Sequence, residues 1–191
     1  DALAIWLQAI HVARAQGNGS NKACVVLTGL PAAGKTCLMS QLIVRALSLS
    51  TSTLVPILVK VQLMQRRLQT DQAVFKHAWN WVDAFLCCVH GEDSEVYTML
   101  RQAMTARRAL LLIDGIDEGG QHRDAIERHI TEVLAPQGHV MLVTSRPNGL
   151  KEDCFRAYFH RVQLGGLTLE QQQQVVRMRV EESKCAGLVN Y

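Results

Sequence analysis

The chain has 191 residues, 48% of them hydrophobic and 19% charged, and its formal net charge is +3. These values predict a globular protein with a sizeable core, built as one domain or as one domain plus part of a second. The net charge is too small, and the basic residues are too evenly spread, to indicate a nucleic-acid-binding surface. No apolar run approaches the roughly 20 residues that span a bilayer, and no secretory signal is visible.

The six cysteines, at positions 24, 37, 87, 88, 154 and 185, show no C-x-x-C spacing. Cys24 and Cys37 fall in expected core elements, so reduced thiols in a cytoplasmic protein are the expected state. The chain opens on aspartate rather than methionine, and its last residues form no recognisable terminal element. We therefore expect a segment of a longer protein.

The first expected element is a helix, because Leu3, Trp6, Leu7, Ile10 and Ala13 recur on one helical face. Glycine and asparagine residues at 16–21 then break it. A short apolar run at 23–28 is typical of a buried strand, and apolar residues at helical spacing from 38 to 47 predict a second helix.

A segment that fits the phosphate-binding pattern G-x-x-x-x-G-K-[ST] lies between this strand and this helix. Its residues are Gly29, Leu30, Pro31, Ala32, Ala33, Gly34, Lys35 and Thr36, and Cys37 follows in the helix. A strand, a glycine loop and a helix bring successive backbone N–H groups and a helix N-terminus to phosphate oxygens. Lys35 would add a positive charge at the β- and γ-phosphates, and Thr36 a hydroxyl for Mg²⁺. The strand before the segment and the helix after it disfavour the alternative, an ordinary glycine-rich turn.

Four further strands are expected, at residues 54–61, 109–113, 139–144 and 160–164. Pro56 cannot donate a ladder hydrogen bond, which predicts that its strand lies at an edge of the sheet or begins late. Further helices are expected at 71–89, after Ser94, at 123–134 and after a capping box at 168–171. In the helix at 71–89, core or partner packing is favoured over base stacking for Trp79 and Trp81.

Strands that alternate with helices through short loops predict parallel pairing with right-handed crossovers. We therefore expect an α/β protein with three layers and a central, mostly parallel five-stranded sheet. The phosphate loop should then lie at the C-terminal edge of that sheet.

An acidic motif, Asp114-Gly115-Ile116-Asp117-Glu118, follows the apolar strand at 109–113 directly. Asp114 at the strand tip can hold the Mg²⁺ water shell opposite Thr36. Asp117 and Glu118 supply carboxylates near the γ-phosphate, where one of them can orient or deprotonate water. The alternative is a solvated acidic loop, which a strand and a phosphate loop in the same chain disfavour.

Arg146 follows the strand at 139–144, within Thr144-Ser145-Arg146-Pro147. An arginine there can reach the γ-phosphate and report whether the triphosphate is intact. The alternative, a surface arginine, is disfavoured by the expectation that its strand lies beside the strand that ends at Asp114.

The glycine loop, the Asp-Gly-x-Asp-Glu motif and Thr-Ser-Arg-Pro, in this order, resemble a NACHT domain, of the STAND class of P-loop ATPases. The resemblance covers roughly residues 23–180. It implies an ATP/ADP-controlled switch in a larger signalling protein, often with an N-terminal effector domain, C-terminal repeats and self-association on activation.

The resemblance also implies roles for single residues. It makes Lys35 and Thr36 the phosphate and Mg²⁺ residues, Asp114 the metal-side acid, Asp117 and Glu118 the hydrolytic acids, and Arg146 the first sensor. Ala32 departs from the family, which commonly has glycine there, and a backbone with φ > 0 at Ala32 would be strained. The family's adenine-side Gly-x-Pro segment and winged-helix domain do not occur in this sequence.

The expected organisation is an N-terminal helix and linker at 1–20, a nucleotide-binding domain at 21–165, and the start of a small helical domain at 166–191. The leading hypothesis is a switch that binds ATP or ADP with Mg²⁺, hydrolyses ATP slowly and self-associates when activated. Two alternatives stay open: a P-loop kinase that transfers the γ-phosphate to a small acceptor, and a nucleotide-holding scaffold without turnover.

Overall fold

A computed structural model describes residues 2–15, 23–48 and 53–179. Its centre is a five-stranded sheet with the strand order β2-β3-β4-β1-β5. The strands are β1 (Cys24–Thr28), β2 (Val55–Lys60), β3 (Ala109–Asp114), β4 (Val140–Ser145) and β5 (Phe159–Gln163). Each pair of neighbouring strands is parallel. The predicted α/β fold with a five-stranded parallel sheet is confirmed.

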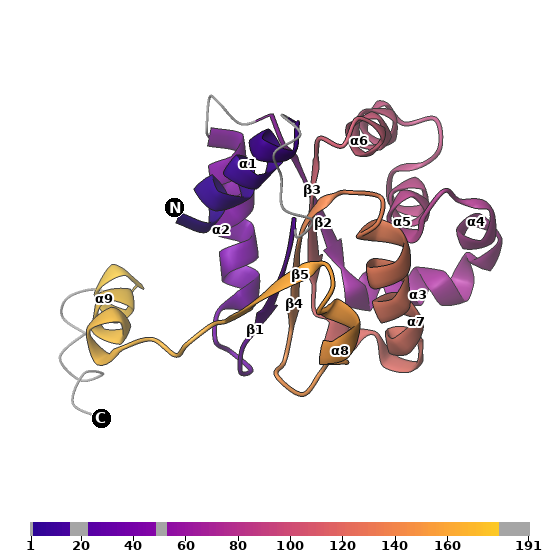
Figure 1. The fold of residues 1–191 in the computed structure, drawn as a ribbon. Coiled ribbons are helices and arrows are strands. Elements are labelled where there is room, and N and C mark those ends of the chain that lie inside the picture. The colour runs from indigo at the N-terminus through magenta and orange to yellow at the C-terminus, as the bar shows by residue number, and fades with distance from the viewer. Residues whose placement is uncertain (1, 16–22, 49–52, 180–191) are drawn as a thin grey trace.

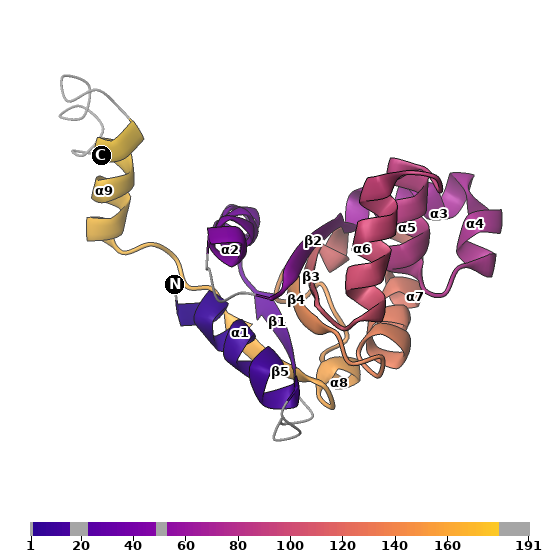
Figure 2. The ribbon, with the colours of Figure 1, turned by 90° about the horizontal axis from the view of Figure 1, so that it is seen from above.

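Helices cover both faces of the sheet, as Figures 1 and 2 show. One face carries α1 (Ala2–Ala15) and α2 (Lys35–Ser48). The helices on the other side are α3 (Val61–Thr70), α4 (Gln72–His77), α5 (Trp81–His90), α6 (Glu95–Thr105), α7 (Arg123–Arg128) and α8 (Glu152–Phe155). The three layers place the loop after β1 and the ends of β3 and β4 at one edge of the sheet.

The strands divide their side chains between two apolar clusters, one on each face. In β1, Val25 and Leu27 face the α1–α2 side, and Cys24 and Val26 face the other side. The central strands are buried throughout, which explains their continuous apolar sequence. β5 is mostly exposed, in keeping with its place at an edge of the sheet.

The strand with Pro56 lies at the other edge, as predicted. It spans Val55–Lys60 rather than 54–61, and Val61 instead opens α3, a helix that the sequence analysis did not predict. A proline is tolerated on an edge strand because an N–H that points to solvent is not needed for the ladder.

The single helix predicted at 71–89 is wrong, because the chain forms α4 and α5 there. Ala78 and Asn80 between them have extended backbones. The Asn80 side chain accepts a hydrogen bond from the Asp83 N–H at 2.9 Å and so caps α5. Trp81 packs in α5 with its ring stacked on His129, whereas Trp79 lies in the connection and is 38% exposed.

The helix predicted at 123–134 begins as α7 and continues as a π-helical segment, His129–Leu134. The predicted capping box is confirmed at α9 (Leu169–Arg179): Thr168 N–H donates to Gln171 Oε1 at 3.0 Å, and Gln171 N–H donates to Thr168 Oγ1 at 3.3 Å. In both views α9 stands apart from the sheet (Figures 1 and 2).

The linker expected at 16–20 and residues 180–191 of the expected helical domain lie outside the described residues. In the parts of the chain that the structure covers, no helix has the length and apolar character needed to cross a membrane.

Candidate functional site

The loop between β1 and α2 has a backbone conformation suited to glycine at two positions. Gly34 has φ +90° and Ala32 has φ +59°. An alanine with positive φ is strained, as the sequence analysis anticipated for this position. The first i→i−4 hydrogen bond after the loop runs from Leu38 N–H to Gly34 O at 2.9 Å. The N–H groups of Lys35, Thr36 and Cys37 precede that bond, and helix geometry leaves them for a ligand or solvent.

The Lys35 side chain folds along the loop rather than away from it. Its Nζ donates to Gly29 O at 2.7 Å and to Leu30 O at 2.9 Å. These carbonyls hold the ammonium group at the mouth of the loop, where its charge supplements the N-terminal dipole of α2.

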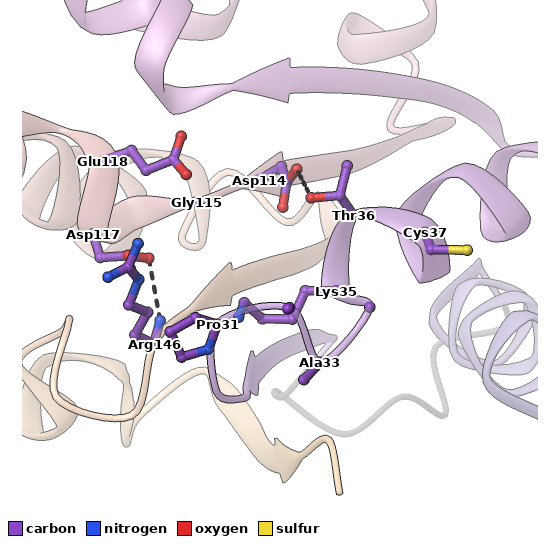
Figure 3. Close-up of a pocket in the computed structure, with 12 residues that line it drawn as sticks. Pro31, Ala33, Lys35, Thr36, Cys37, Asp114, Gly115, Asp117, Glu118 and Arg146 are labelled. Atoms are coloured by element: carbon purple, nitrogen blue, oxygen red, sulfur yellow. Dashed lines mark hydrogen bonds and ion pairs between the residues drawn. The ribbon is translucent and has the colours of Figure 1, made fainter. Parts of the chain in front are cut away.

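Thr36 and Asp114 meet across the edge of the sheet. Thr36, in the first turn of α2, donates its hydroxyl to Asp114 Oδ2 at 2.9 Å, and Asp114 ends β3 (Figure 3). The other carboxylate oxygen, Oδ1, accepts a hydrogen bond from Thr144 Oγ1 at 2.5 Å. Both oxygens of Asp114 are therefore held by threonine hydroxyls, one from α2 and one from β4.

Arg146 and Asp117, which the sequence analysis gave separate roles, bind each other. Arg146 Nε lies 2.9 Å from Asp117 Oδ2, and the Arg146 backbone N–H donates to Asp117 Oδ1 at 3.1 Å (Figure 3). The 3-10 turn Ile116–Glu118 carries Asp117 toward β4 for this contact. Arg146 remains 57% exposed while Asp117 is only 13% exposed.

Glu118 is the exposed acid of the motif. Its carboxyl carbon would lie 3.1 Å from a Cβ at Gly115, and Gly115 has φ +79°. A side chain at position 115 would therefore both strain the turn and displace Glu118.

A cavity of about 300 Å³ brings most of the predicted site residues together. It is lined by Pro31, Ala32, Ala33, Gly34, Lys35, Thr36, Cys37, Asp114, Gly115, Asp117, Glu118 and Arg146. Gly29 and Leu30 are absent from this lining and contribute the carbonyls that hold Lys35. Cys37 lies on the first turn of α2, and its sulfur points away from Asp114 (Figure 3).

A second cavity, of about 750 Å³, lies against the other side of the same loop and is mainly apolar. Leu30 and the loop residues form one side, Leu38 and Gln41 of α2 contribute to the lining, and Leu164, Gly166, Leu167 and Gln172 close it. The sequence alone does not predict this cavity, because the cavity depends on where the chain returns after β5. Thr144 was likewise not predicted as a site residue, although it lies in the Thr-Ser-Arg-Pro motif.

The residues present fit a magnesium-bound nucleotide. Mg²⁺ prefers hard oxygen ligands in an octahedron with bonds of about 2.0–2.1 Å, which places neighbouring ligands roughly 2.9 Å apart. Thr36 Oγ1 and Asp114 Oδ2 have this separation and chemistry. A helix N-terminus and a lysine beside them suit phosphate oxygens.

Comparison with known proteins decides the family. The model of the NACHT domain family matches residues 23–183. The chain belongs to the NACHT domain family. A NACHT domain is a P-loop NTPase domain, and the phosphate loop at 29–36 lies within the matched residues. No curated protein matches this NACHT chain in a sequence search.

Solved structures resemble this NACHT domain in fold. PCH-2 of C. elegans superposes with a TM-score of 0.56 at 15% identity, over 93% of this chain and 45% of that one. One chain of the HORMA:CdnC:Trip13 complex of E. coli MS115-1 gives a TM-score of 0.53 at 16% identity, over 100% of this chain and 71% of that one. The Orc1 protein of Aeropyrum pernix, solved in complex with DNA, gives 0.54 at 17% identity, over 93% and 48%. The NACHT chain thus spans about half the length of two of these three proteins.

Proposed function

We propose that this NACHT domain binds ATP and ADP with Mg²⁺, hydrolyses ATP slowly, and acts as a switch that couples the nucleotide state to self-association in a larger signalling protein. The observation that carries the proposal is the Thr36–Asp114 pair, 2.9 Å apart, in a cavity that also holds the loop, Lys35 and Arg146. Family membership supports nucleotide binding.

In this proposal the nucleotide occupies both cavities. The phosphates occupy the polar cavity, against the N–H groups at the start of α2, and Lys35 turns from the carbonyls of Gly29 and Leu30 toward the β- and γ-phosphates. The base occupies the apolar cavity beyond the loop. Mg²⁺, held by Thr36 and Asp114 directly or through its water, offsets the negative charge of the phosphate oxygens.

The contacts of the acidic motif support different roles for its last two residues. Each oxygen of Asp117 accepts one N–H donor from Arg146, and the backbone donor remains even if the guanidinium turns to the γ-phosphate. Glu118 is exposed, lines the same cavity and is the better placed carboxylate to orient water toward the γ-phosphorus. Attack by that water breaks the bond from the γ-phosphorus to its bridging oxygen and releases ADP and phosphate.

The test follows the fate of the γ-phosphate. Purified protein is incubated with Mg²⁺ and ATP labelled at the γ-position, with and without candidate small acceptors. Slow release of free labelled phosphate supports the switch, a labelled acceptor would indicate a kinase, and bound but intact ATP would indicate a scaffold. Glu118→Gln should lower release about 100-fold or more while Mg·ATP affinity stays within a few-fold. Glu132→Gln, which changes an exposed acid outside the cavity, should leave release unchanged.

A further inference from the structure

Thr144 occupies a core position of β4 at which an apolar side chain is expected. Val140 and Leu142 of β4 face the α1–α2 side, and Thr144 continues this alternation. Its side chain is completely buried, with 0% exposed. Burying a hydroxyl costs free energy unless it is hydrogen-bonded, and a valine would fill the same space without that requirement.

The hydroxyl of Thr144 has two partners, both in the acidic motif. It donates to Asp114 Oδ1 at 2.5 Å and accepts from the Gly115 N–H at 2.9 Å. β3 and β4 are paired up to Ile113 and Val143, which places Asp114 and Thr144 side by side at the strand ends. One hydroxyl thus fixes both the carboxylate and the turn that follows it.

The consequence is a defined orientation of Asp114. With Oδ1 held by Thr144, Oδ2 is left to face the Thr36 hydroxyl, 2.9 Å away. A carboxylate that is already in this orientation loses less conformational freedom when it binds a cation. Groups that hold a metal ligand in this way commonly change metal affinity by about 10- to 100-fold when they are removed.

We propose that Thr144 is a positioning residue for Mg²⁺, which acts through Asp114 and not by contact with the nucleotide. The inference rests on the proposed function, because the orientation of Asp114 matters only if Mg·nucleotide binds there. It adds a residue on β4, the strand that also leads to Arg146, to the machinery on which the metal depends.

The experiment measures ATP affinity by titration over a range of Mg²⁺ concentrations and in excess EDTA. Thr144→Val removes the hydroxyl and keeps the shape of the side chain, so the Mg²⁺ concentration at half-effect should rise about tenfold or more. ATP affinity in EDTA should stay within about twofold. Thr144→Ser, which keeps the hydroxyl, should restore the Mg²⁺ dependence to within about threefold of wild type.

The matched control is Ser145→Ala, the neighbouring buried hydroxyl, whose side chain points to the opposite face of β4. It should leave the Mg²⁺ dependence unchanged. In an Asp114→Asn background, Thr144→Val should have no further effect on Mg²⁺ dependence, because the residue through which it acts has lost its charge.

An unchanged half-effect concentration in folded Thr144→Val would overturn the inference, as would an equal loss of affinity with and without Mg²⁺. If Thr144→Val does not fold, Thr144→Ala is the second variant without the hydroxyl. Failure of both to fold would also overturn the inference, since the hydroxyl would then be needed for folding. If the wild-type protein binds no ATP at any Mg²⁺ concentration and none in EDTA, the proposed function itself is refuted.

Discussion

Arg146 and Asp117 form two contacts with each other, an ion pair of 2.9 Å through the guanidinium Nε and a backbone hydrogen bond of 3.1 Å. Each end of this pair lines the candidate phosphate cavity. In the proposed switch, the guanidinium of Arg146 leaves Asp117 to contact the γ-phosphate of ATP. We therefore expect the pair to oppose ATP binding and to have no such effect on ADP, which lacks the γ-phosphate.

This relationship predicts that Asp117→Asn shifts the nucleotide preference toward ATP. The variant keeps an oxygen for the Arg146 N–H but removes the charge that holds the guanidinium. A partly exposed ion pair contributes about 1 kcal/mol, so the ratio of ADP to ATP dissociation constants should rise about fivefold. Titrations with both nucleotides measure the ratio, and Asp124→Asn, which removes a carboxylate outside the cavity, serves as the control. A ratio that stays at the wild-type value would show that the pair does not compete with ATP.

Arg146→Ala should have the opposite effect on ATP and little effect on ADP. A charge-assisted hydrogen bond to the γ-phosphate is worth about 1.5–3 kcal/mol, or roughly 10- to 150-fold in the dissociation constant for ATP. The same titrations apply. Equal weakening of ATP and ADP would make Arg146 a general phosphate contact and would remove the basis for a sensor.

Ala32→Gly should stabilise the protein, because glycine adopts positive φ without the strain that alanine carries at +59°. Relief of about 1–2 kcal/mol of native-state strain exceeds the cost of about 0.4–1 kcal/mol from the greater freedom of glycine in the unfolded chain, so a net gain of a few tenths to about 1 kcal/mol is expected. Urea unfolding measures it. The matched control is Ala33→Gly, which has no positive φ and should destabilise by about 0.5–1 kcal/mol. Destabilisation of similar size by both variants would contradict the claim of strain at Ala32.

The sequence predicted most of the sheet because its strands carry continuous apolar runs that only a doubly covered parallel sheet can bury. Pro56 even indicated which strand lies at an edge. The break between α4 and α5 was missed because the apolar spacing continues across Asn80, while the backbone there is set by a local hydrogen bond from Asp83. Such a cap competes with helix continuation and leaves no trace in periodicity.

The sequence motifs predicted which residues form the site but not which of them contact one another. Spacing placed Thr36 opposite Asp114, and the structure has them hydrogen-bonded. The Arg146–Asp117 pair depends on the direction in which the turn Ile116–Glu118 leaves β3, and the role of Thr144 depends on the register of β3 against β4. Both are tertiary features that a single sequence does not encode in local spacing.

His129 predicts a pH dependence of stability. Its Nε2 accepts a hydrogen bond from Trp81 N–H at 2.9 Å, and its ring stacks on Trp81 with the centroids 4.5 Å apart. Burial lowers the pKa of His129 from its usual 6.5 to about 4. Between these values the unfolded chain binds a proton that the folded protein does not, so this contribution to stability is complete above pH 6.5 and is lost as the pH falls toward 4.

The wild-type free energy of unfolding should therefore fall by up to about 2 kcal/mol more than that of His129→Gln between pH 7.5 and pH 5. Glutamine keeps an acceptor and does not titrate in this range. Urea unfolding at the two pH values gives both numbers, and comparison with the variant removes the contributions of the other histidines. Parallel pH profiles for the two proteins would contradict the assignment.

The most direct test of nucleotide binding at the loop is the effect of ATP on the melting temperature of three proteins. At about 100 times its dissociation constant, Mg·ATP should stabilise the wild type by roughly 2.7 kcal/mol, or about 5–10 °C for a domain of this size. Lys35→Ala should lose most of this shift. Lys60→Ala, which removes a lysine beside Asp114 in the β2–β3 register but outside the cavity, should keep it. An equal shift in all three proteins would contradict the account, because ATP would then bind elsewhere.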